Sequence, residues 1–186
     1  MTAEQAVCAM IKALDAAGIP YLLAGSFSSN YYGIPRSTQD ADFVIQLEGQ
    51  SLGAAMAHLG PDFRLDPQLL FETVTGTTRS VVEIAGTGFK IELFRLSADP
   101  HDQERFRRRV TQPLTDCTAL LPTVEDVLIT KLRWLLRADR HKDRDDLHAV
   151  ISVSRELIDW PYVYRWCDEH GTRALLDEIR ASIPPI

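Results

Sequence analysis

The spacing of apolar residues, either helix-like or strand-like, predicts the order of helices and strands in the first part of the chain. Apolar residues recur about every 3.6 positions over 3–17, a spacing that predicts a helix ended by Gly18. The apolar run at 21–24 predicts a short buried strand, and a second short helix is expected from residue 26 or 27 to residue 32. At 40–45, acidic and apolar residues alternate, which predicts another strand.

The middle of the chain predicts a helix and a hairpin. The pattern favours a helix at 51–59 and two β-like runs at 80–84 and 89–96, joined by the turn Gly86-Thr87-Gly88. Residues 60–67 and 98–101 are expected to be the least regular stretches.

From residue 123 onward the pattern is helical. Thr123 to Asp126 resembles a capping box, with Asp in place of the usual Glu or Gln, and the helix continues to about residue 138. Three more helices are expected, at 142–152, 161–170 and 172–182. Mixed strands and helices followed by helices alone predict an α+β core over residues 1–121 and a C-terminal helical bundle over residues 122–186.

Composition narrows the class of protein. Of the 186 residues, 45% are apolar and 25% charged, as in ordinary globular proteins. The net charge of −6 argues against indiscriminate nucleic-acid binding. Cys8, Cys117 and Cys167 show no zinc-ligand spacing and favour reduced thiols. With neither a signal-peptide pattern nor an apolar run long enough for a membrane helix, a cytoplasmic location is expected.

Asp40 and Asp42 are the strongest candidates for chemistry. Residues i and i+2 of a strand point to the same face, so these two carboxylates lie close together and repel each other. Their apolar neighbours indicate a central strand. A cation between the two acids best explains the pair, and hard oxygen ligands suit Mg²⁺.

Glu92 is a third candidate ligand. It interrupts an apolar run, and Ile91 and Leu93 would face the other side of the strand. If this strand pairs next to the one carrying Asp40, three carboxylates converge, which is the arrangement that two-metal phosphoryl or nucleotidyl transfer requires.

Three further features could contribute to the site. Gly25 and Ser26 follow the first strand and open a helix, where backbone N–H groups favour phosphate. Lys131 lies within the apolar stripe of its helix, so it must reach a charge, which a triphosphate would provide, or extend past its neighbours into solvent. The segment from Lys142 to Asp146 is charged and could be either part of the site or a solvated helix start.

The acidic residues can also be explained without a metal site. Alternating acids often form a solvated strand face, and Glu92 could be an acid on an edge strand.

The motifs resemble those of the DNA polymerase β-like nucleotidyltransferase superfamily. The segments that carry the resemblance are Ala24-Gly25-Ser26, then Arg36-Ser37-Thr38-Gln39-Asp40-Ala41-Asp42, then Ile91-Glu92-Leu93. The Arg-x-Thr-x-Asp-x-Asp form looks like the abortive-infection and toxin–antitoxin branch. The resemblance implies a small mixed β-sheet nucleotidyltransferase core with flanking helices.

The same resemblance assigns roles to individual residues. One or two Mg²⁺ ions would be held by Asp40, Asp42 and Glu92. A nucleoside triphosphate (NTP), such as ATP, would be bound by four residues: Gly25, Ser26, Arg36 and Thr38. Lys131 and Asp145, with Asp143 as an alternative to Asp145, would complete the catalytic set.

The implied reaction is Mg²⁺-dependent transfer of a nucleoside monophosphate from an NTP to a hydroxyl of a tRNA, a protein or a small molecule. The resemblance also raises a toxin role with an antitoxin partner. The alternative is a catalytically inactive domain of the same fold that binds a nucleotide or a partner.

Overall fold

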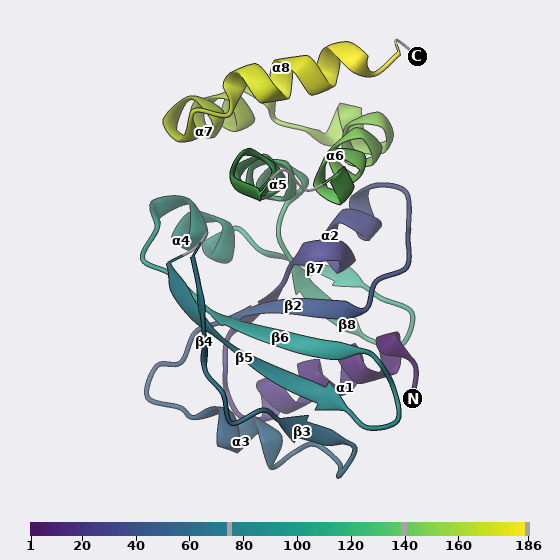
Figure 1. The fold of residues 1–186 in the computed structure, drawn as a ribbon, viewed down its shortest axis with the longest axis vertical. Coiled ribbons are helices and arrows are strands. Elements are labelled where there is room, and N and C mark those ends of the chain that lie inside the picture. The colour runs from purple at the N-terminus through teal and green to yellow at the C-terminus, as the bar shows by residue number, and fades with distance from the viewer. Residues whose placement is uncertain (74–75, 139–140, 185–186) are drawn as a thin grey trace. The chain divides into compact units, whose positions relative to one another are not determined.

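The computed structural model describes residues 1–73, 76–138 and 141–184, which form two compact units (Figure 1). The first unit consists of Met1–Ser26 and Ser37–Leu121, and the second of Phe27–Arg36 and Pro122–Ile186. Residues 27–36, which lie within the predicted core 1–121, group with the C-terminal helices in this division.

The first unit is built around β-strands with helices beside them. Its elements are α1 (Ala3–Ala16), β1 (Tyr21–Leu23), β2 (Asp40–Ile45), α3 (Leu52–Met56), β3 (Phe63–Leu65), β4 (Leu70–Glu72), β5 (Thr77–Ile84), β6 (Lys90–Arg95), α4 (Pro100–Arg107), β7 (Val110–Pro113) and β8 (Thr118–Leu121). Helix α2 (Gly25–Tyr32) begins in this unit and continues in the second.

The main sheet has six strands in the order β1-β2-β6-β5-β3, with β4 also paired to β5. Strands β2 and β6 are parallel, and the other pairs are antiparallel. Strands β7 and β8 form a separate two-stranded sheet. This mixed sheet with flanking helices confirms the predicted α+β class.

The two faces of the sheet differ in polarity because side chains alternate along each strand. Phe43, Ile45, Ile91 and Leu93 share one face and are almost fully buried. Helix α1, which has seven buried residues, runs behind the strands in Figure 1. The opposite face carries the acidic residues of β2 and β6, so packing of the core leaves the carboxylates on the other side.

The second unit is a helical bundle, as predicted. It contains α5 (Val124–Ala138), α6 (His141–Ser154), the short 3₁₀ helix η1 (Arg155–Leu157), α7 (Trp160–His170) and α8 (Arg173–Ser182). One apolar cluster joins α5, α6, α7 and α8, and Tyr32 of α2 belongs to it. The Tyr32 hydroxyl donates to the Pro122 carbonyl at 3.0 Å, and Ser154 Oγ donates to the Tyr32 carbonyl at 2.6 Å. These contacts explain why residues 27–36 group with the bundle. None of the described helices is long and apolar enough to cross a bilayer.

The expectation of irregular structure at 60–67 and 98–101 is wrong. Strand β3 lies in the first stretch and α4 begins in the second. Strands of three or four residues are too short for a clear alternation, and β4, β7 and β8 were missed for the same reason. The start of α4 did carry a signal, because Asp99 caps the helix ahead of Pro100. The helix predicted at 51–59 is only the five residues of α3.

The expectation that all cysteines are reduced is also wrong. Cys8 of α1 and Cys117, just before β8, form a disulfide with their Cα atoms 5.8 Å apart. The two residues are separated by 109 positions, which concealed their proximity in the sequence. Cys167 is free and buried.

Reduction of this disulfide should destabilise the first unit. A cross-link that closes a loop of about 100 residues stabilises a fold by about 4 kcal/mol, because it restricts the unfolded chain. Thermal unfolding with and without dithiothreitol measures the effect. The double variant Cys8→Ala/Cys117→Ala is the control and should unfold at the same temperature in both buffers. An unchanged midpoint for the wild type in reductant would contradict this prediction.

Candidate active site

Three carboxylates lie on one face of the parallel pair β2–β6. Asp42 and Glu92 are direct register partners, so their side chains project from the same face, and Asp40 shares that face two residues earlier. Glu92 is only 7% exposed, and Asp40 and Asp42 are partly buried. The strand pairing on which the prediction for Glu92 depended is therefore confirmed, and Glu92 is not on an edge strand.

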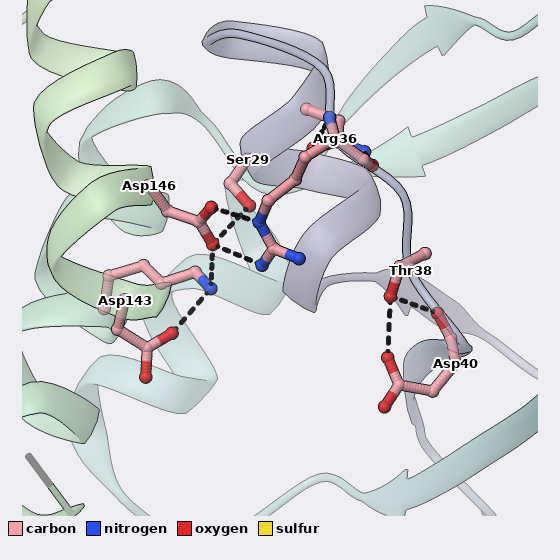
Figure 2. A network of polar contacts seen from close by, with 8 residues as sticks. Ser29, Arg36, Thr38, Asp40, Asp143 and Asp146 are labelled. Carbon is pink, nitrogen blue, oxygen red and sulfur yellow. Dashed lines mark hydrogen bonds and ion pairs between the residues drawn. The ribbon is translucent and has the colours of Figure 1, made fainter. Parts of the chain in front are cut away.

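Thr38 positions the first carboxylate. Its hydroxyl lies 2.9 Å from Asp40 Oδ1 and 3.2 Å from the Asp40 carbonyl oxygen (Figure 2). A hydroxyl that donates to one oxygen of a carboxylate fixes the rotation of that group and leaves the second oxygen for another ligand. Thr38 was predicted to bind nucleotide, and the contact in the structure is with a predicted metal ligand.

Gly25 lies directly against the second carboxylate. Its φ is +58°, and a Cβ built on it would lie 1.9 Å from Asp42 Oδ2. The Ala24 N–H donates to the Asp42 carbonyl at 2.7 Å, which ties the end of β1 to β2. A side chain at residue 25 would therefore occupy the position of the Asp42 carboxylate. Ser26, the next residue of α2, is buried.

The third carboxylate has a basic partner that the sequence analysis missed. Arg79 Nη1 lies 2.5 Å from Glu92 Oε2, and Lys90 Nζ is 3.9 Å from Oε1. Arg79 is on β5, where Val81 is the register partner of Glu92, so Arg79 and Glu92 share a face. The strand expected at 80–84 begins one residue after Arg79, whereas β5 begins at Thr77, and the pairing with β6 could not be read from the sequence.

These residues suit a divalent cation. All three side chains offer hard oxygen ligands, the set preferred by Mg²⁺. The absence of a Cβ at Gly25 leaves the room that the Asp42 carboxylate occupies. A different group in the described residues has the tight spacing of a metal site. Within residues 1–73, 76–138 and 141–184, the possible ligand atoms of Asp99, His101 and Asp102 all lie within 4.8 Å of one another, whereas those of the three acids do not. Glu92 Oε2 is held instead by its ion pair with Arg79.

The group at Asp99, His101 and Asp102 has a structural explanation. Asp99 accepts the backbone N–H groups of His101 and Asp102 at 3.0 and 3.1 Å and so caps α4. Asp102 accepts the hydroxyl of Ser97 at 2.5 Å and pairs with Arg105 at 3.0 Å. These are the contacts of a helix start.

A second polar cluster lies within the helical unit. Lys131 of α5 is 8% exposed, and its Nζ lies 2.8 Å from Asp143 Oδ1 and 2.6 Å from Asp146 Oδ2 of α6. Lys131 therefore does reach a charge inside its apolar stripe, but the partners are carboxylates. Asp143 and Asp146 are three residues apart and share a helix face, whereas Asp145 is exposed. That spacing could have identified Asp146, which the sequence analysis did not select.

Asp146 also binds the segment after α2. Arg36 donates from Nε to Oδ1 at 2.7 Å and from Nη2 to Oδ2 at 2.9 Å, and Ser29 donates to Oδ2 at 3.1 Å (Figure 2). Burial raises the pKa of Asp146, but hydrogen bonds and charges from Arg36 and Lys131 outweigh this effect and hold the pKa below its usual value. The positive charges of Lys131 and Arg36 thus lie against the carboxylates of Asp143 and Asp146.

The fold is that of the nucleotidyltransferases. A structure of ANT(2'')-Ia in complex with adenylyl-2''-tobramycin aligns over 94% of this chain and 99% of its own, with TM-score 0.64 and 11% identity. A solution structure of the antibiotic-resistance factor ANT(2'')-Ia aligns over 96% of both chains, with TM-score 0.60 and 11% identity. An antigenic nucleotidyltransferase-like protein from Paracoccidioides brasiliensis aligns over 98% and 94%, with TM-score 0.57 and 17% identity.

The chain belongs to the AbiEii family, described as the nucleotidyl transferase AbiEii toxin of a type IV toxin–antitoxin system, whose model matches residues 12–183. This membership confirms the resemblance drawn from the motifs and the assignment as a nucleotidyltransferase. No curated protein sequence matches the chain significantly.

Replacement of Gly25 by Ala should destabilise the protein strongly. The left-handed backbone and the overlap with Asp42 act together, and the expected loss is at least about 2 kcal/mol of unfolding free energy. Gly18→Ala is the matched control, since Gly18 has φ +63° with nothing within 4 Å of its Cβ position, so that only the backbone cost of about 1 kcal/mol applies. Urea denaturation compares the two variants. Equal losses would show that the contact with Asp42 is unimportant.

Asp146→Asn should cost about 3 kcal/mol at pH 7, because it leaves Lys131 and Arg36 short of a buried counter-charge. The folded pKa of Asp146 is depressed, so its stabilising contribution is present above the unfolded value of about 3.9 and is lost as pH falls through the folded pKa.

The difference in unfolding free energy between wild type and Asp146→Asn should therefore shrink below about pH 4, which denaturant titrations at several pH values would measure. Asp145→Asn, at the adjacent exposed position, should leave stability unchanged. A difference that does not depend on pH would contradict the prediction.

Proposed function

We propose that this protein is an Mg²⁺-dependent nucleotidyltransferase that transfers a nucleoside monophosphate from an NTP to a hydroxyl acceptor. The single observation that carries the proposal is the register pairing of Asp42 with Glu92, with Gly25 packed against the Asp42 carboxylate. Carboxylates brought to one sheet face beside the start of a helix are what metal-assisted phosphoryl chemistry requires.

Asp40, Asp42 and Glu92 would hold the metal. When bound there, Mg²⁺ would neutralise phosphate charge and lower the pKa of the attacking hydroxyl. Thr38 would keep Asp40 Oδ1 in a fixed direction through its hydrogen bond. The chain's own contribution is thus to orient three oxygen ligands before the substrate arrives.

Gly25 and Ser26 would bind the triphosphate at the start of α2. Backbone N–H groups and the helix dipole favour anions at that end, and a glycine allows the phosphate to come close to the backbone. The nucleotide contacts predicted for Arg36 and Lys131 and the catalytic role predicted for Asp145 stay predictions.

In the reaction, the acceptor oxygen forms a bond to the α-phosphorus while the bond from that phosphorus to the oxygen bridging to the β-phosphate breaks. Pyrophosphate leaves, and the hydroxyl proton passes to solvent or to a nearby base. A tRNA, a protein and a small molecule are all candidate acceptors. The fold shared with ANT(2'')-Ia, which was solved with adenylyl-2''-tobramycin, supports including aminoglycosides in the panel.

The family description supports a toxin role with an antitoxin partner. We propose a cytoplasmic site of action, because the NTP and the candidate tRNA acceptors are found there. Induced expression of the wild type should arrest growth of a bacterial host, and Asp42→Asn should not. Growth arrest by both forms would separate toxicity from the carboxylate site.

Asp42→Asn should reduce transfer at least about a hundredfold, because it removes one of three anionic ligands. The measurements are release of labelled pyrophosphate from γ-labelled NTP and labelling of the acceptor from α-labelled NTP, with Mg²⁺, over a panel of tRNA, protein and aminoglycoside. Asp62→Asn, at an exposed position of the same unit, should retain wild-type transfer.

Equal transfer by wild type and Asp42→Asn would overturn the proposal. Nucleotide binding that depends on Mg²⁺ but yields no product with any acceptor would favour the alternative of an inactive nucleotide-binding domain.

A further inference from the structure

We propose that Arg79 is the counter-ion of Glu92 when no metal is bound. It raises the affinity of the site for a metal bound with a triphosphate and lowers its affinity for a free divalent metal. The inference rests on the proposed function, since it concerns the same carboxylates. It adds a basic residue that neither the motifs nor the family description includes.

The position of Arg79 follows from the order of the strands. Strand β6 lies between β2 and β5, so Asp42 flanks Glu92 on one side and Arg79 approaches it from the other. The ion pair is short, with 2.5 Å between Arg79 Nη1 and Glu92 Oε2. The guanidinium carbon also lies 5.8 Å from the centre of the Phe94 ring, on the same face.

The surroundings of Arg79 show a partly desolvated group. Its side chain is 29% exposed and that of Glu92 is 9% exposed. In the described part of the chain, the buried Nε of Arg79 has no hydrogen-bond partner. Arg64 and Glu83 form another pair on the same sheet, but both of those side chains are largely exposed. Solvent screens such a surface pair, so it contributes little, whereas the pair at Glu92 lies where charges interact more strongly.

The charges of the site explain what Arg79 does there. The carboxyl group of Glu92 is buried next to Asp42, and a buried carboxylate without a counter-charge is costly. Arg79 supplies that charge in close contact, while Lys90 is 3.9 Å away and about half exposed. A free divalent ion that binds Glu92 must accept the repulsion of the nearby guanidinium, so Arg79 weakens binding of metal alone.

A triphosphate reverses the sign of this effect. It brings several negative charges with the metal, and a guanidinium pairs well with phosphate oxygens through its planar fork of N–H donors. Loss of Arg79 should therefore strengthen the binding of free metal and weaken the binding of metal with nucleotide. A residue with only a structural role would shift both affinities in the same direction or not at all.

The test is isothermal titration calorimetry of the full chain with two ligands. The first is Mn²⁺ alone, used as a probe with oxygen-ligand preferences like those of Mg²⁺. The second is a non-hydrolysable ATP analogue in excess Mg²⁺. Arg79→Met should bind Mn²⁺ at least about tenfold more tightly than wild type and the nucleotide about tenfold more weakly. Arg64→Met is the matched control and should change neither affinity.

Arg79→Lys provides a second test in case the Met variant does not fold. It keeps the positive charge but not the planar fork, so its Mn²⁺ affinity should stay near that of wild type while nucleotide binding weakens. Circular dichroism would establish that each variant is folded before titration.

The outcomes distinguish this inference from the proposed function. If wild type binds Mn²⁺ and Arg79→Met binds it equally or more weakly, the role of Arg79 is overturned and the metal site stands. If neither folded protein binds Mn²⁺ and neither binds the nucleotide with Mg²⁺, the metal site itself is overturned, and the role of Arg79 with it.

Discussion

The contact between the backbone of Gly25 and the carboxylate of Asp42 is the constraint around which the first unit is arranged. It requires a positive φ at the end of β1 and a residue without a side chain. The hydrogen bond from Ala24 to the carbonyl of Asp42 brings β1 and β2 together at the same point. Helix α2 therefore starts where the carboxylate lies, and the backbone proposed to bind phosphate and the side chains proposed to bind metal become parts of one local structure.

Each unit contains its own cluster of carboxylates and basic side chains. In the sheet, Arg79 opposes Glu92, and in the helical bundle Lys131 and Arg36 oppose Asp143 and Asp146. In the second cluster, Ser29 of α2 and Lys131 of α5 both contact Asp146 of α6, so these side chains link α2, α5 and α6. In the first cluster, Asp40 and Asp42 share the face with Glu92, and Lys90 also approaches Glu92. This is the sheet face that we propose for a cation.

The sequence predicted features that depend on local pattern. The acids of β2 alternate visibly, and Gly25 at the start of α2 follows a short apolar run, so both were found. The partners of these residues were not found, because register between strands and spacing between helices decide them. Arg79 meets Glu92 only through the pairing of β5 with β6, and Asp146, not Asp145, meets Lys131 because of helix phase. The disulfide was missed for the same reason, since 109 positions separate its cysteines.

The bond between Cys8 and Cys117 makes a covalent ring of the chain between them. Asp40, Asp42 and Glu92 all lie inside that ring, as do Gly25 and Arg79, whereas helices α5 to α8 lie outside it. A single backbone cut anywhere within the ring would open it without releasing a fragment. A protease that nicks an exposed loop of the first unit would therefore leave the carboxylate-bearing strands tethered to the rest of the chain until the disulfide is reduced.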